Sequence, residues 1–407
     1  MNQVNKNILI ITDSHLYQRV GAAYSRISCY KKALGDSCEF YSLDLNQFYI
    51  SNRTTGFNRC DNSSLNFLNI QDKTDSYLYR NFINLFDFLR PSKLVKFVNQ
   101  RFNKKNTIIL LYTHNFLLFI ITIIYLKFLY GYRVIIEKNE LDTGKQLNVP
   151  LPKGYYLLLF IFLFPVKLLF AFLIDLSAFL GSAIIVISSG LFKIYRFHPN
   201  IYKIPVVVDF QKFEQSTNKP NPLVKFVYMG TFTKKKDSIF LMFKAIKEIK
   251  EIILNEAEFY FIGNGTRTIK QQLEKYIRHH SLDQLIKIGK PIPYASVPQE
   301  LRKYDVALLL RETNIQTRYG FSTKLGEYLA AGLPVLTSNV SDNMLYLRDE
   351  VDSFLVSELS LEQVKLKLGY ILQNRQQLIR MKIEARETAK KYFDIENHAI
   401  SLREIFA

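Results

Sequence analysis

The stretch YGFSTKLGEYLAAGLPV, residues 319–335, joins a glycine-containing loop to a short helix and then to a strand. Ser322 or Thr323 can cap the start of this helix, and Gly332 can end it before the proline that opens the strand. The free N–H groups of a first helical turn attract anions, and Lys324 adds positive charge beside them. The stretch therefore indicates an α/β domain whose helix either holds a phosphate or is an ordinary packing element.

Two further residues of this stretch bear on that choice. Glu327 lies three residues after Lys324, on a neighbouring face of the same helix. A carboxylate there can hold the two vicinal hydroxyls of a ribose, or it can complement the helix dipole, which is typically worth ~0.3–1 kcal/mol. Gly320 permits unusual backbone angles in the loop before the helix. The spacing alone leaves the ligand-binding and the structural interpretation open.

A second stretch, FVYMGTFTKKKD at 226–237, has a similar organisation. It predicts a buried strand ending at Gly230, then a loop that carries Lys234, Lys235 and Lys236 into an amphipathic helix. Cations at the carboxyl end of a parallel strand can form a phosphate site. A solvated basic turn is the alternative.

A third stretch, FYFIGNGTRT at 259–268, places Gly263 and Gly265 directly after a strand. The full dinucleotide fingerprint needs another glycine where Thr268 stands, so the motif is incomplete. The two glycines indicate either a close approach of the backbone to a ligand or a tight turn.

Outside these stretches the chain alternates strands and helices in both halves. Apolar runs such as NILIITDSH, NTIILLYTHN and YRVIIEKNE predict buried strands in the first half, and VKFVYMG, DVALLL and LPVLTSN predict them in the second. Helical patterns separate the runs, which is typical of mostly parallel sheets. Residues 46–80 are rich in Asn, Ser and Asp and predict a long loop. The polar, proline-containing segment 211–222 predicts a linker between two α/β domains.

The composition limits the class of protein. With 407 residues, 48% of them hydrophobic, the chain is long enough for two domains with substantial cores. Its net charge of +18 predicts an anionic partner such as nucleic acid, anionic lipid or a phosphorylated substrate. The three cysteines show no C-x-x-C spacing and predict free thiols in a reducing compartment. Because the first apolar run is too short for a signal peptide, we expect a cytoplasmic protein.

The most hydrophobic segment is YYLLLFIFLFPVKLLFAFLIDLSAFL, residues 155–180. Pro165, Lys167 and Asp175 interrupt it, so that no uninterrupted apolar run of about 18 residues is left for a membrane span. Basic residues beside bulky apolar faces favour a helix that lies at the interface of an anionic membrane. A helix buried in the domain core is the alternative. Peripheral attachment to a membrane is the prediction.

In their order along the chain, these motifs resemble the family 4 glycosyltransferases, retaining enzymes with the GT-B fold. The resemblance rests on YMGTFTKKKD, IGNG, YDVALLL and KLGEYLAAGLPV in the second half, and on VGAAYSRISCYKKAL, VIIEKNE, IIVISS and IPVVVD in the first. It implies two facing Rossmann-like domains with an interdomain cleft, at 1–210 and 223–391, joined by the linker 211–222. We expect a C-terminal helix, at about 392–407, to pack back on the first domain.

The resemblance also implies roles for single residues. Lys236, six residues after Gly230, stands at the place of the family's diphosphate-binding lysine, and Glu327 at that of the glutamate on the ribose hydroxyls. The implied donor-binding residues are Gly21, Gly230, Thr231, Lys236, Gly263, Gly265, Ile292, Phe321, Ser322, Thr323, Lys324 and Glu327. The implied catalytic residues are Lys236, His114 and Glu140. A histidine at a strand end is, by itself, more often structural.

Two positions depart from the family pattern. Thr231 stands where the family usually has an arginine, and Tyr319 stands where it has the first of two paired glutamates. The second difference puts the identity of the donor sugar in doubt. The sequence contains no D-x-D motif, so we expect neither a metal at the donor site nor a cofactor besides the nucleotide sugar.

The implied activity is transfer of a sugar from a nucleotide-diphosphate sugar to an acceptor hydroxyl, with the anomeric configuration retained. A lipid-linked saccharide in the synthesis of bacterial capsule, O-antigen or exopolysaccharide suits the basic, apolar first domain, and the enzyme would lie on the cytoplasmic face of the inner membrane. The alternatives are an inactive membrane-associated scaffold, a nucleotide-sugar epimerase and a basic nucleic-acid-binding protein. The sequence shows no nucleic-acid reader motif, so we expect no nucleic-acid partner.

Overall fold

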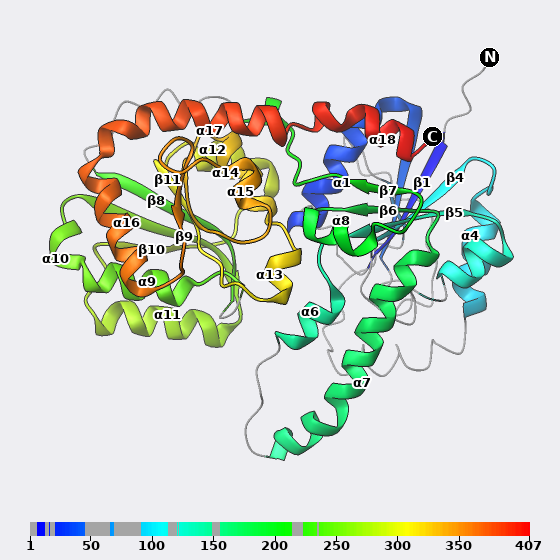
Figure 1. The fold of residues 1–407 in the computed structure, drawn as a ribbon, viewed down its shortest axis with the longest axis horizontal. Coiled ribbons are helices and arrows are strands. Elements are labelled where there is room, and N and C mark those ends of the chain that lie inside the picture. Colours follow the sequence, from blue (N-terminus) through cyan, green and yellow to red (C-terminus); the bar gives the residue numbers. More distant parts are fainter. Residues whose placement is uncertain are drawn as a thin grey trace. The chain divides into compact units, whose positions relative to one another are not determined.

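The computed structural model describes residues 6–12, 16, 21–44, 66–68, 91–112, 120, 122–148, 155–213, 223–233 and 236–407. The chain divides into two compact units. Unit 1 comprises Met1–Pro205 and His398–Ala407, and unit 2 comprises Val206–Asn397. Each unit is described by itself below (Figure 1).

Unit 1 contains a seven-stranded sheet with the order β3-β2-β1-β4-β5-β6-β7, in which neighbouring strands pair in parallel. Its central strands are runs of Ile, Leu and Val that are buried, as expected for a parallel sheet covered by helices. The strand order reverses between β1 and β4, as in Rossmann-like sheets. The strands are β1 (Lys6–Thr12), β2 (Cys38–Asp44), β3 (Asn66–Leu68), β4 (Thr107–Tyr112), β5 (Arg133–Lys138), β6 (Ala183–Val186) and β7 (Ile201–Lys203).

The last helix of the chain belongs to unit 1. Helix α18 (Ala399–Ile405) packs against α1 (Gly21–Leu34), and Arg403 Nη2 donates to the carbonyl of Ala33 at 3.3 Å. Figure 1 shows these two helices together, with α7 leaving the sheet on its other side. The remaining helices of the unit are α4 (Pro91–Arg101), a π-helix (Thr122–Leu129), α6 (Asp142–Leu147), α7 (Tyr155–Ser177) and α8 (Ser189–Tyr195).

Buried ion pairs hold the helices of unit 1 at the end of β5. Arg26 on α1 pairs with Glu137 at 2.5 Å, and Lys138 pairs with Asp142 at 2.5 Å and with Asp175 of α7 at 2.8 Å. Burial raises the pKa of Glu137, and the charge of Arg26 opposes that rise. Removing one member of such a pair would leave an uncompensated buried charge, which is strongly destabilising.

Asp175 also anchors the start of α6. Its Oδ1 accepts the backbone N–H of Asp142 at 3.0 Å, and its Oδ2 accepts the N–H and the hydroxyl of Thr143 at 2.9 and 2.6 Å. First-turn N–H groups have no partner within their own helix, so this carboxylate supplies one from outside. Asp175 is therefore a structural link between α6 and α7.

From Phe160 onward, where its side chains are described, helix α7 exposes more than half of its apolar side chains. It runs through Pro165 without a break, and Phe162 and Phe172 are 75% and 54% exposed. The segment Phe160–Leu180 is long and apolar enough to cross a membrane by length and composition, and 22% of its most apolar window is buried. Figure 1 shows its first turns extending away from the sheet of unit 1. A helix of the domain core, one of the two interpretations of this segment, would be buried.

Unit 2 contains a six-stranded parallel sheet with the order β10-β9-β8-β11-β12-β13. The order reverses between β8 and β11, so this is the topological switch point of the sheet. The chain therefore contains two sheets of the same Rossmann-like type. The strands are β8 (Val224–Phe232), β9 (Ala257–Gly265), β10 (Ile286–Gly289), β11 (Val306–Leu309), β12 (Val335–Ser338) and β13 (Ser353–Val356).

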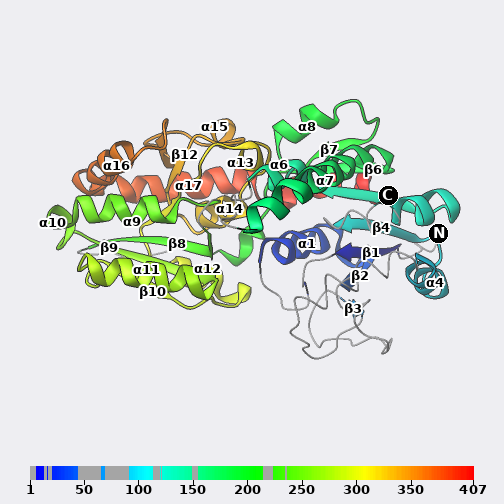
Figure 2. The same cartoon turned by 90° about the horizontal axis from the view of Figure 1, so that it is seen from below.

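Helices cover both faces of this sheet. Figure 1 shows α9 and α11 below it and α12, α14 and α17 above it, and α16 packs against α9. Figure 2 shows α11, α9 and α16 across the same face. The helices are α9 (Ile239–Glu248), α10 (Lys250–Ile253), α11 (Arg267–His279), α12 (Val297–Leu301), α13 (Ile315–Tyr319), α14 (Thr323–Ala330), α15 (Asn343–Tyr346), α16 (Leu361–Gln373) and α17 (Leu378–Tyr392).

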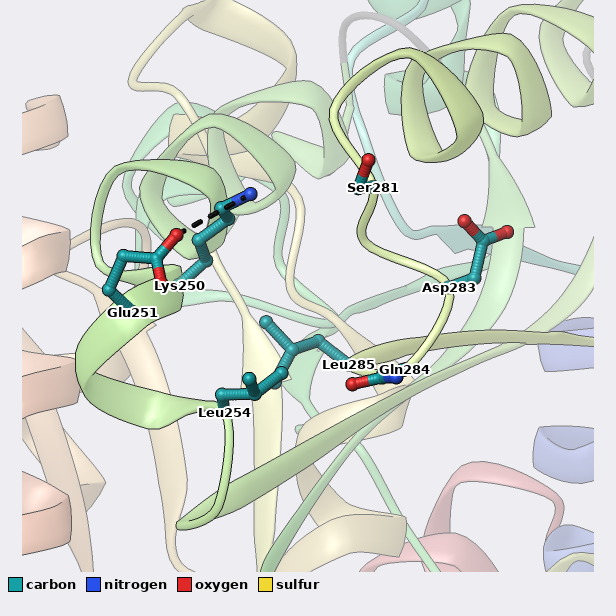
Figure 3. A pocket seen from close by; sticks show the side chains of 7 residues that line it. All are labelled: Lys250, Glu251, Leu254, Ser281, Asp283, Gln284 and Leu285. Atoms are coloured by element: carbon teal, nitrogen blue, oxygen red, sulfur yellow. Dashed lines mark ion pairs between the residues drawn. The ribbon is translucent and has the colours of Figure 1, made fainter.

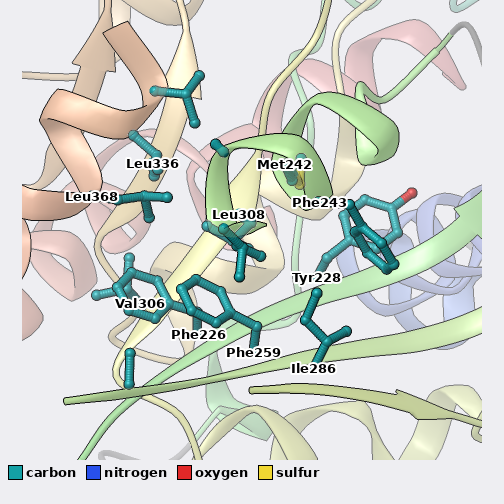
Figure 4. Packing of buried hydrophobic residues seen from close by; sticks show 14 of the residues in the cluster. Phe226, Tyr228, Met242, Phe243, Phe259, Ile286, Val306, Leu308, Leu336 and Leu368 are labelled. Carbon is teal, nitrogen blue, oxygen red and sulfur yellow. The ribbon is translucent and has the colours of Figure 1, made fainter. Parts of the chain in front are cut away.

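The lower face of the sheet carries an aromatic core (Figure 4). Phe226 of β8 stacks on Phe259 of β9 with ring centroids 4.7 Å apart, and Phe243 of α9 meets Phe261 edge-on at 4.6 Å. Burying one such side chain fully is worth about 1.5–3 kcal/mol. The alternating aromatic pattern of FVYMG and FYFIG thus fixes the register between β8 and β9, from Val224↔Ala257 to Phe232↔Gly265.

Several predicted boundaries differ from those in the structure. Strand β8 continues to Phe232 instead of ending at Gly230. Strand β13 (Ser353–Val356) and the short helix α13 (Ile315–Tyr319) have no counterpart among the predicted elements. Unit 2 begins at Val206, and most of the predicted linker 211–222 lies outside the described residues. So does the predicted loop 46–80, apart from β3.

Candidate functional site

The candidate site lies where β8 and β11 reach the carboxyl edge of the unit 2 sheet. Ligands of open α/β sheets bind at such a switch point, outside the carboxyl ends of the strands. Gly230 lies at this end of β8, and the side chain of Lys324 from α14 passes directly over it. A β-carbon added at Gly230 would lie 2.3 Å from Lys324 Cε, so the end of this lysine would have to shift if position 230 carried a side chain.

The glycines of β9 serve close strand packing. A β-carbon on Gly263 would lie 1.7 Å from the carbonyl oxygen of Gly230, and one on Gly265 would lie 2.9 Å from Phe232 Cβ. These contacts explain why β8 and β9 stay paired beyond Gly230. Gly263 and Gly265 therefore lie within a strand, not in a tight turn, and they allow close packing against β8. Their contact with a donor stays a prediction.

A buried carboxylate holds the cations of the site together. Lys324 Nζ lies 2.5 Å from Asp237 Oδ2, and the hydroxyl of Tyr228 lies 2.8 Å from the same oxygen. Arg311, which follows β11, brings its Nε to 3.2 Å from Asp237 Oδ1. Asp237 and Arg311 are 2% and 4% exposed. Within the described residues, Asp237 is the one carboxylate that pairs with either cation, so the cluster carries an excess positive charge.

The electrostatics of Asp237 reflect these partners. Burial alone would raise the pKa of its carboxyl, but the charges of Lys324 and Arg311 outweigh burial and lower the pKa to about 2. Burial also raises the pKa of Tyr228 well above its ordinary value, and the negative charge of Asp237 raises it further. At neutral pH the cluster thus contains an ionised carboxylate, two cations and a neutral phenol.

Helix α14 is fixed against β8 by a tyrosine. The hydroxyl of Tyr328 accepts the N–H of Met229 at 2.8 Å and lies 3.2 Å from its carbonyl oxygen. At the other end of the helix, Gly332 has a φ of +78° and its N–H donates to the carbonyl of Leu329 at 2.9 Å. The prediction that Gly332 ends this helix is confirmed.

The start of α14 differs from the prediction. Ser322 is the N-cap residue, but its side chain makes no capping hydrogen bond, and the first turn contains no acidic residue. Gly320 has an ordinary φ of −87°. It is the residue that ends α13, and its N–H donates to the carbonyl of Gln316 at 2.9 Å. The unusual backbone angles that Gly320 permits are therefore not used here.

The other predicted donor residues of unit 2 are spread over this edge and the neighbouring loops. Phe321 is 7% exposed and stacks on Tyr346 at 5.6 Å, so its side chain is part of the core and its backbone is what remains for a ligand. Thr231 is exposed. Ser322, Thr323, Lys236, Ile292 and Glu327 are partly exposed.

The candidate residues of unit 1 belong to the edge of the other sheet. Gly21 opens α1 with a φ of +83°, a conformation that favours glycine, and it is exposed. Glu140 follows β5, is partly exposed, and has its Oε1 3.7 Å from Lys145 Nζ. His114 lies outside the described residues. Their catalytic and donor-binding roles stay predictions.

Asp237 and Arg311 were not among the predicted site residues. Asp237 directly follows the predicted Lys236, but acidic residues at a helix start are common and give no special signal. Arg311 follows the strand DVALLL and precedes Lys324 by 13 residues, but it lies 74 residues after Asp237. Only the strand order, which places β11 beside β8, brings the three together.

A hollow elsewhere on unit 2 is a poor candidate for this site. It measures about 360 Å³ and lies between α10 and the turn that leads from α11 into β10 (Figure 3). Both segments enter the amino ends of their strands, opposite the switch-point edge. Its charged side chains include Lys250 and Glu251, which pair with each other at 3.5 Å. Within the described residues, no group of three or more His, Cys, Asp or Glu side chains is placed to hold a metal.

Comparison with known proteins bears on the whole chain. HepE from Anabaena, solved with UDP-glucose, has a TM-score of 0.66 at 12% identity over 98% of this chain and 99% of HepE. Sucrose-phosphate synthase from Thermosynechococcus elongatus has a TM-score of 0.71 at 14% identity over 98% of each chain. A glycosyltransferase from Rickettsia africae has a TM-score of 0.63 at 11% identity over 99% of this chain and 98% of that one. A comparison with curated protein sequences finds no match.

At these identities the likeness shows the fold, and it confirms the predicted GT-B architecture. The family comes from the sequence of the second half: residues 209–388 match the model described as "Glycosyl transferases group 1". This segment includes Gly230, Asp237, Arg311 and α14, the elements of the switch-point cluster. Residues 209–388, less than half of the chain, match this family, and on that match the chain is a glycosyltransferase.

Proposed function

We propose that this enzyme moves a sugar from a nucleoside-diphosphate sugar to a hydroxyl of a lipid-linked saccharide, with retention, in the synthesis of a bacterial surface polysaccharide. The observation that supports the donor half is the cluster of Lys324, Asp237 and Arg311 beside Gly230. Two cations share one buried carboxylate there. Because buried charge is costly unless it is balanced, this edge favours an anionic ligand such as a diphosphate.

The proposed chemistry follows from where charge develops. The bond between the anomeric carbon and the diphosphate breaks while a bond to the acceptor oxygen forms on the same face of the sugar. The acceptor's proton passes to the departing phosphate. Lys236, Lys324 and the N–H groups at the start of α14 would stabilise the negative charge on the leaving group. Removing one such donor typically costs about 3 kcal/mol, or about a hundredfold in rate.

Glu327 is proposed to orient the donor by accepting hydrogen bonds from the ribose hydroxyls. It lies on α14 and is partly exposed. Holding the nucleotide in one orientation aligns the anomeric carbon for attack, which lowers the entropy cost of reaching the transition state. HepE, a protein of the same fold, was solved with UDP-glucose, so uridine is the first base to test.

Helix α7 supports the acceptor half of the proposal. Its exposed side chains include Phe162, Leu169 and Phe172, which would be costly to leave in water and are typical of a surface that enters a bilayer. The chain's net charge of +18 favours a membrane rich in anionic lipid. We therefore propose that the enzyme works on the cytoplasmic face of the inner membrane, where α7 would hold it close to a lipid-linked acceptor.

A donor screen tests the proposal. UDP-, GDP- and dTDP-sugars are added in turn to purified wild-type enzyme and to Glu327→Ala, and the melting temperature is recorded. A ligand at a hundred times its dissociation constant adds about 2.7 kcal/mol of stability, so one class should shift the wild type clearly. The same class should give a smaller shift with Glu327→Ala.

Release of the nucleoside diphosphate in the presence of a lipid-linked saccharide then tests transfer. Stabilisation by a donor without any turnover would favour the inactive scaffold, which Thr231 and Tyr319 keep open. A folded protein that no nucleotide sugar stabilises would contradict the donor site itself.

A further inference from the structure

We propose that Arg311 is a donor-binding residue whose guanidinium contacts the diphosphate of the bound nucleotide sugar. The proposal rests on the donor site proposed above and adds to it a residue from a different strand. In this chain the second strong cation would come from the end of β11.

The fold fixes the backbone of Arg311 at the switch point. Its N–H donates to Ser338 Oγ at 2.9 Å, and that hydroxyl donates to its carbonyl at 2.6 Å. The preceding residue, Leu310, accepts the N–H of Ser238 at 2.8 Å. The end of β11 is thereby tied both to β12 and to the segment that follows Lys236. These hydrogen bonds hold the backbone of Arg311 in place beside the loop that carries Lys236.

The guanidinium of Arg311, by contrast, is loosely held. Its Nε lies 3.2 Å from Asp237 Oδ1, yet neither atom makes a hydrogen bond within the part of the chain that the structure describes. The other oxygen of Asp237 is shared between Lys324 and Tyr228. A guanidinium has five N–H donors in a planar fork. Arg311 is 4% exposed, and among the described residues Asp237 is its one ion-pair partner.

A buried arginine with this surplus of donors matches the chemistry of a diphosphate. Phosphate oxygens accept paired hydrogen bonds from a guanidinium fork, and such charge-assisted pairs are among the strongest hydrogen bonds in proteins. Lys324 contributes a point charge on the far side of Asp237. The carboxylate would then keep both cations in place while the ligand is absent. A purely structural Arg311 would instead serve only to balance Asp237.

Binding of UDP and of uridine to Arg311 variants separates these roles. Affinities are measured by calorimetry for the wild type, Arg311→Gln and Arg311→Lys. We expect Arg311→Gln to weaken UDP binding roughly tenfold to a hundredfold and to leave uridine binding unchanged, because uridine has no phosphate. Arg311→Lys keeps the charge but loses the fork, so it should bind UDP with intermediate affinity. Arg278→Gln, on the exposed end of α11, is the matched control for loss of one positive charge.

Each outcome decides the question. Equal UDP affinity in the wild type and both variants overturns the role of Arg311 while leaving the donor site intact. Parallel losses for UDP and uridine, with a lowered melting temperature in both variants, indicate a structural role and also overturn it. If the wild type binds neither UDP, GDP nor dTDP, the donor site fails, and this inference fails with it. Weakening by Arg278→Gln equal to that by Arg311→Gln would show a general effect of net charge.

Discussion

The ammonium of Lys324 lies 2.5 Å from Asp237 Oδ2, and its side chain reaches that carboxylate by crossing the face of Gly230. This ion pair joins helix α14 to the segment after β8. Its path is open because Gly230 has no side chain. The same ammonium lies 5.3 Å from the ring centre of Tyr228, so an aromatic face also stabilises its charge. The position of the lysine, and not only its presence, is set by residues of β8.

Replacing Gly230 with alanine tests this arrangement. The new methyl group would displace Lys324 from Asp237, so we expect UDP affinity to fall about tenfold through loss of one charged contact. Calorimetry measures the affinity, and circular dichroism checks the fold. Gly369→Ala is the matched control, because a β-carbon there meets nothing within 4 Å and the helix should gain about 0.5–1 kcal/mol. Unchanged UDP affinity in Gly230→Ala would mean that Lys324 acts equally well from elsewhere.

Acid should weaken the cluster in a defined range of pH. The pKa of Asp237 is lowered from 3.8 to about 2 in the folded protein, because Lys324 and Arg311 outweigh the opposing effect of burial. A lowered pKa adds stability above pH 3.8 that is lost as the pH falls towards 2. The shift corresponds to roughly 2 kcal/mol.

The stability difference between the wild type and Asp237→Asn should therefore shrink as pH falls. Urea unfolding at pH values from 7 to 2.5 measures it. At pH 7 the variant should be less stable by about 3 kcal/mol, since it leaves buried Arg311 and partly buried Lys324 without their carboxylate. A difference that stays constant over the whole range would show that Asp237 does not titrate with a lowered pKa.

Glu327 should make the enzyme discriminate between ribose and deoxyribose. If its carboxylate accepts hydrogen bonds from both ribose hydroxyls, wild-type enzyme should bind UDP about tenfold more tightly than 2′-deoxy-UDP. Glu327→Ala should bind both nucleotides with the same, weaker affinity. Competition against a fluorescent nucleotide measures both constants. Retained discrimination in Glu327→Ala would assign the ribose contact to another residue and leave Glu327 the role of balancing the helix dipole.

Asp175 should be important for stability even though it lies in the apolar helix α7. Asp175→Asn removes a partner of buried Lys138 and weakens the hydrogen bonds to the start of α6, which should cost about 2–4 kcal/mol. Hydrogen exchange at the amide of Thr143 should become faster because its acceptor is weakened. Glu362→Gln removes half of an exposed ion pair and should cost less than about 1 kcal/mol. Equal effects of the two changes would rule out a special role of the buried pair.

Membrane binding should depend on the exposed face of α7. Phe162→Asp combined with Phe172→Asp places two charges where apolar side chains would enter the bilayer. Sedimentation with vesicles that contain phosphatidylglycerol should fall at least about tenfold, since each buried aromatic ring contributes about 1.5–3 kcal/mol. Ile252→Asp, at a residue 75% exposed on unit 2, should bind vesicles like the wild type. Equal sedimentation of all three proteins would remove α7 as the membrane contact.

Local sequence patterns were sufficient for much of the fold. Gly332 was expected to end α14 because helices commonly end with glycine at positive φ, and it has a φ of +78°. The apolar runs of β1, β4, β5 and β8 were recognisable because parallel strands buried on both faces are continuously hydrophobic. The order of these motifs along the chain was enough to indicate the family.

Features that depend on contacts between distant segments were not predictable in the same way. The sequence shows that Gly320 permits unusual backbone angles, but it does not show that Gly320 ends α13 with an ordinary φ of −87°. Asp175 looked like an interruption of an apolar helix because its partners, Lys138 and α6, are remote in sequence. Arg311 gave no signal at all, since its relation to Asp237 arises only when β11 inserts beside β8.

The packing of α18 on α1 has a consequence for synthesis of the protein on the ribosome. Domains generally fold as units during translation, starting from the N-terminal one. Here α1 emerges early, but its partner helix α18 follows the whole of unit 2. The surface of α1 that α18 covers must therefore stay uncovered while unit 2 is made and folds. Unit 1 is thus translated first but finishes folding last, when α18 arrives. Until then, the uncovered surface of α1 is where a chaperone would bind.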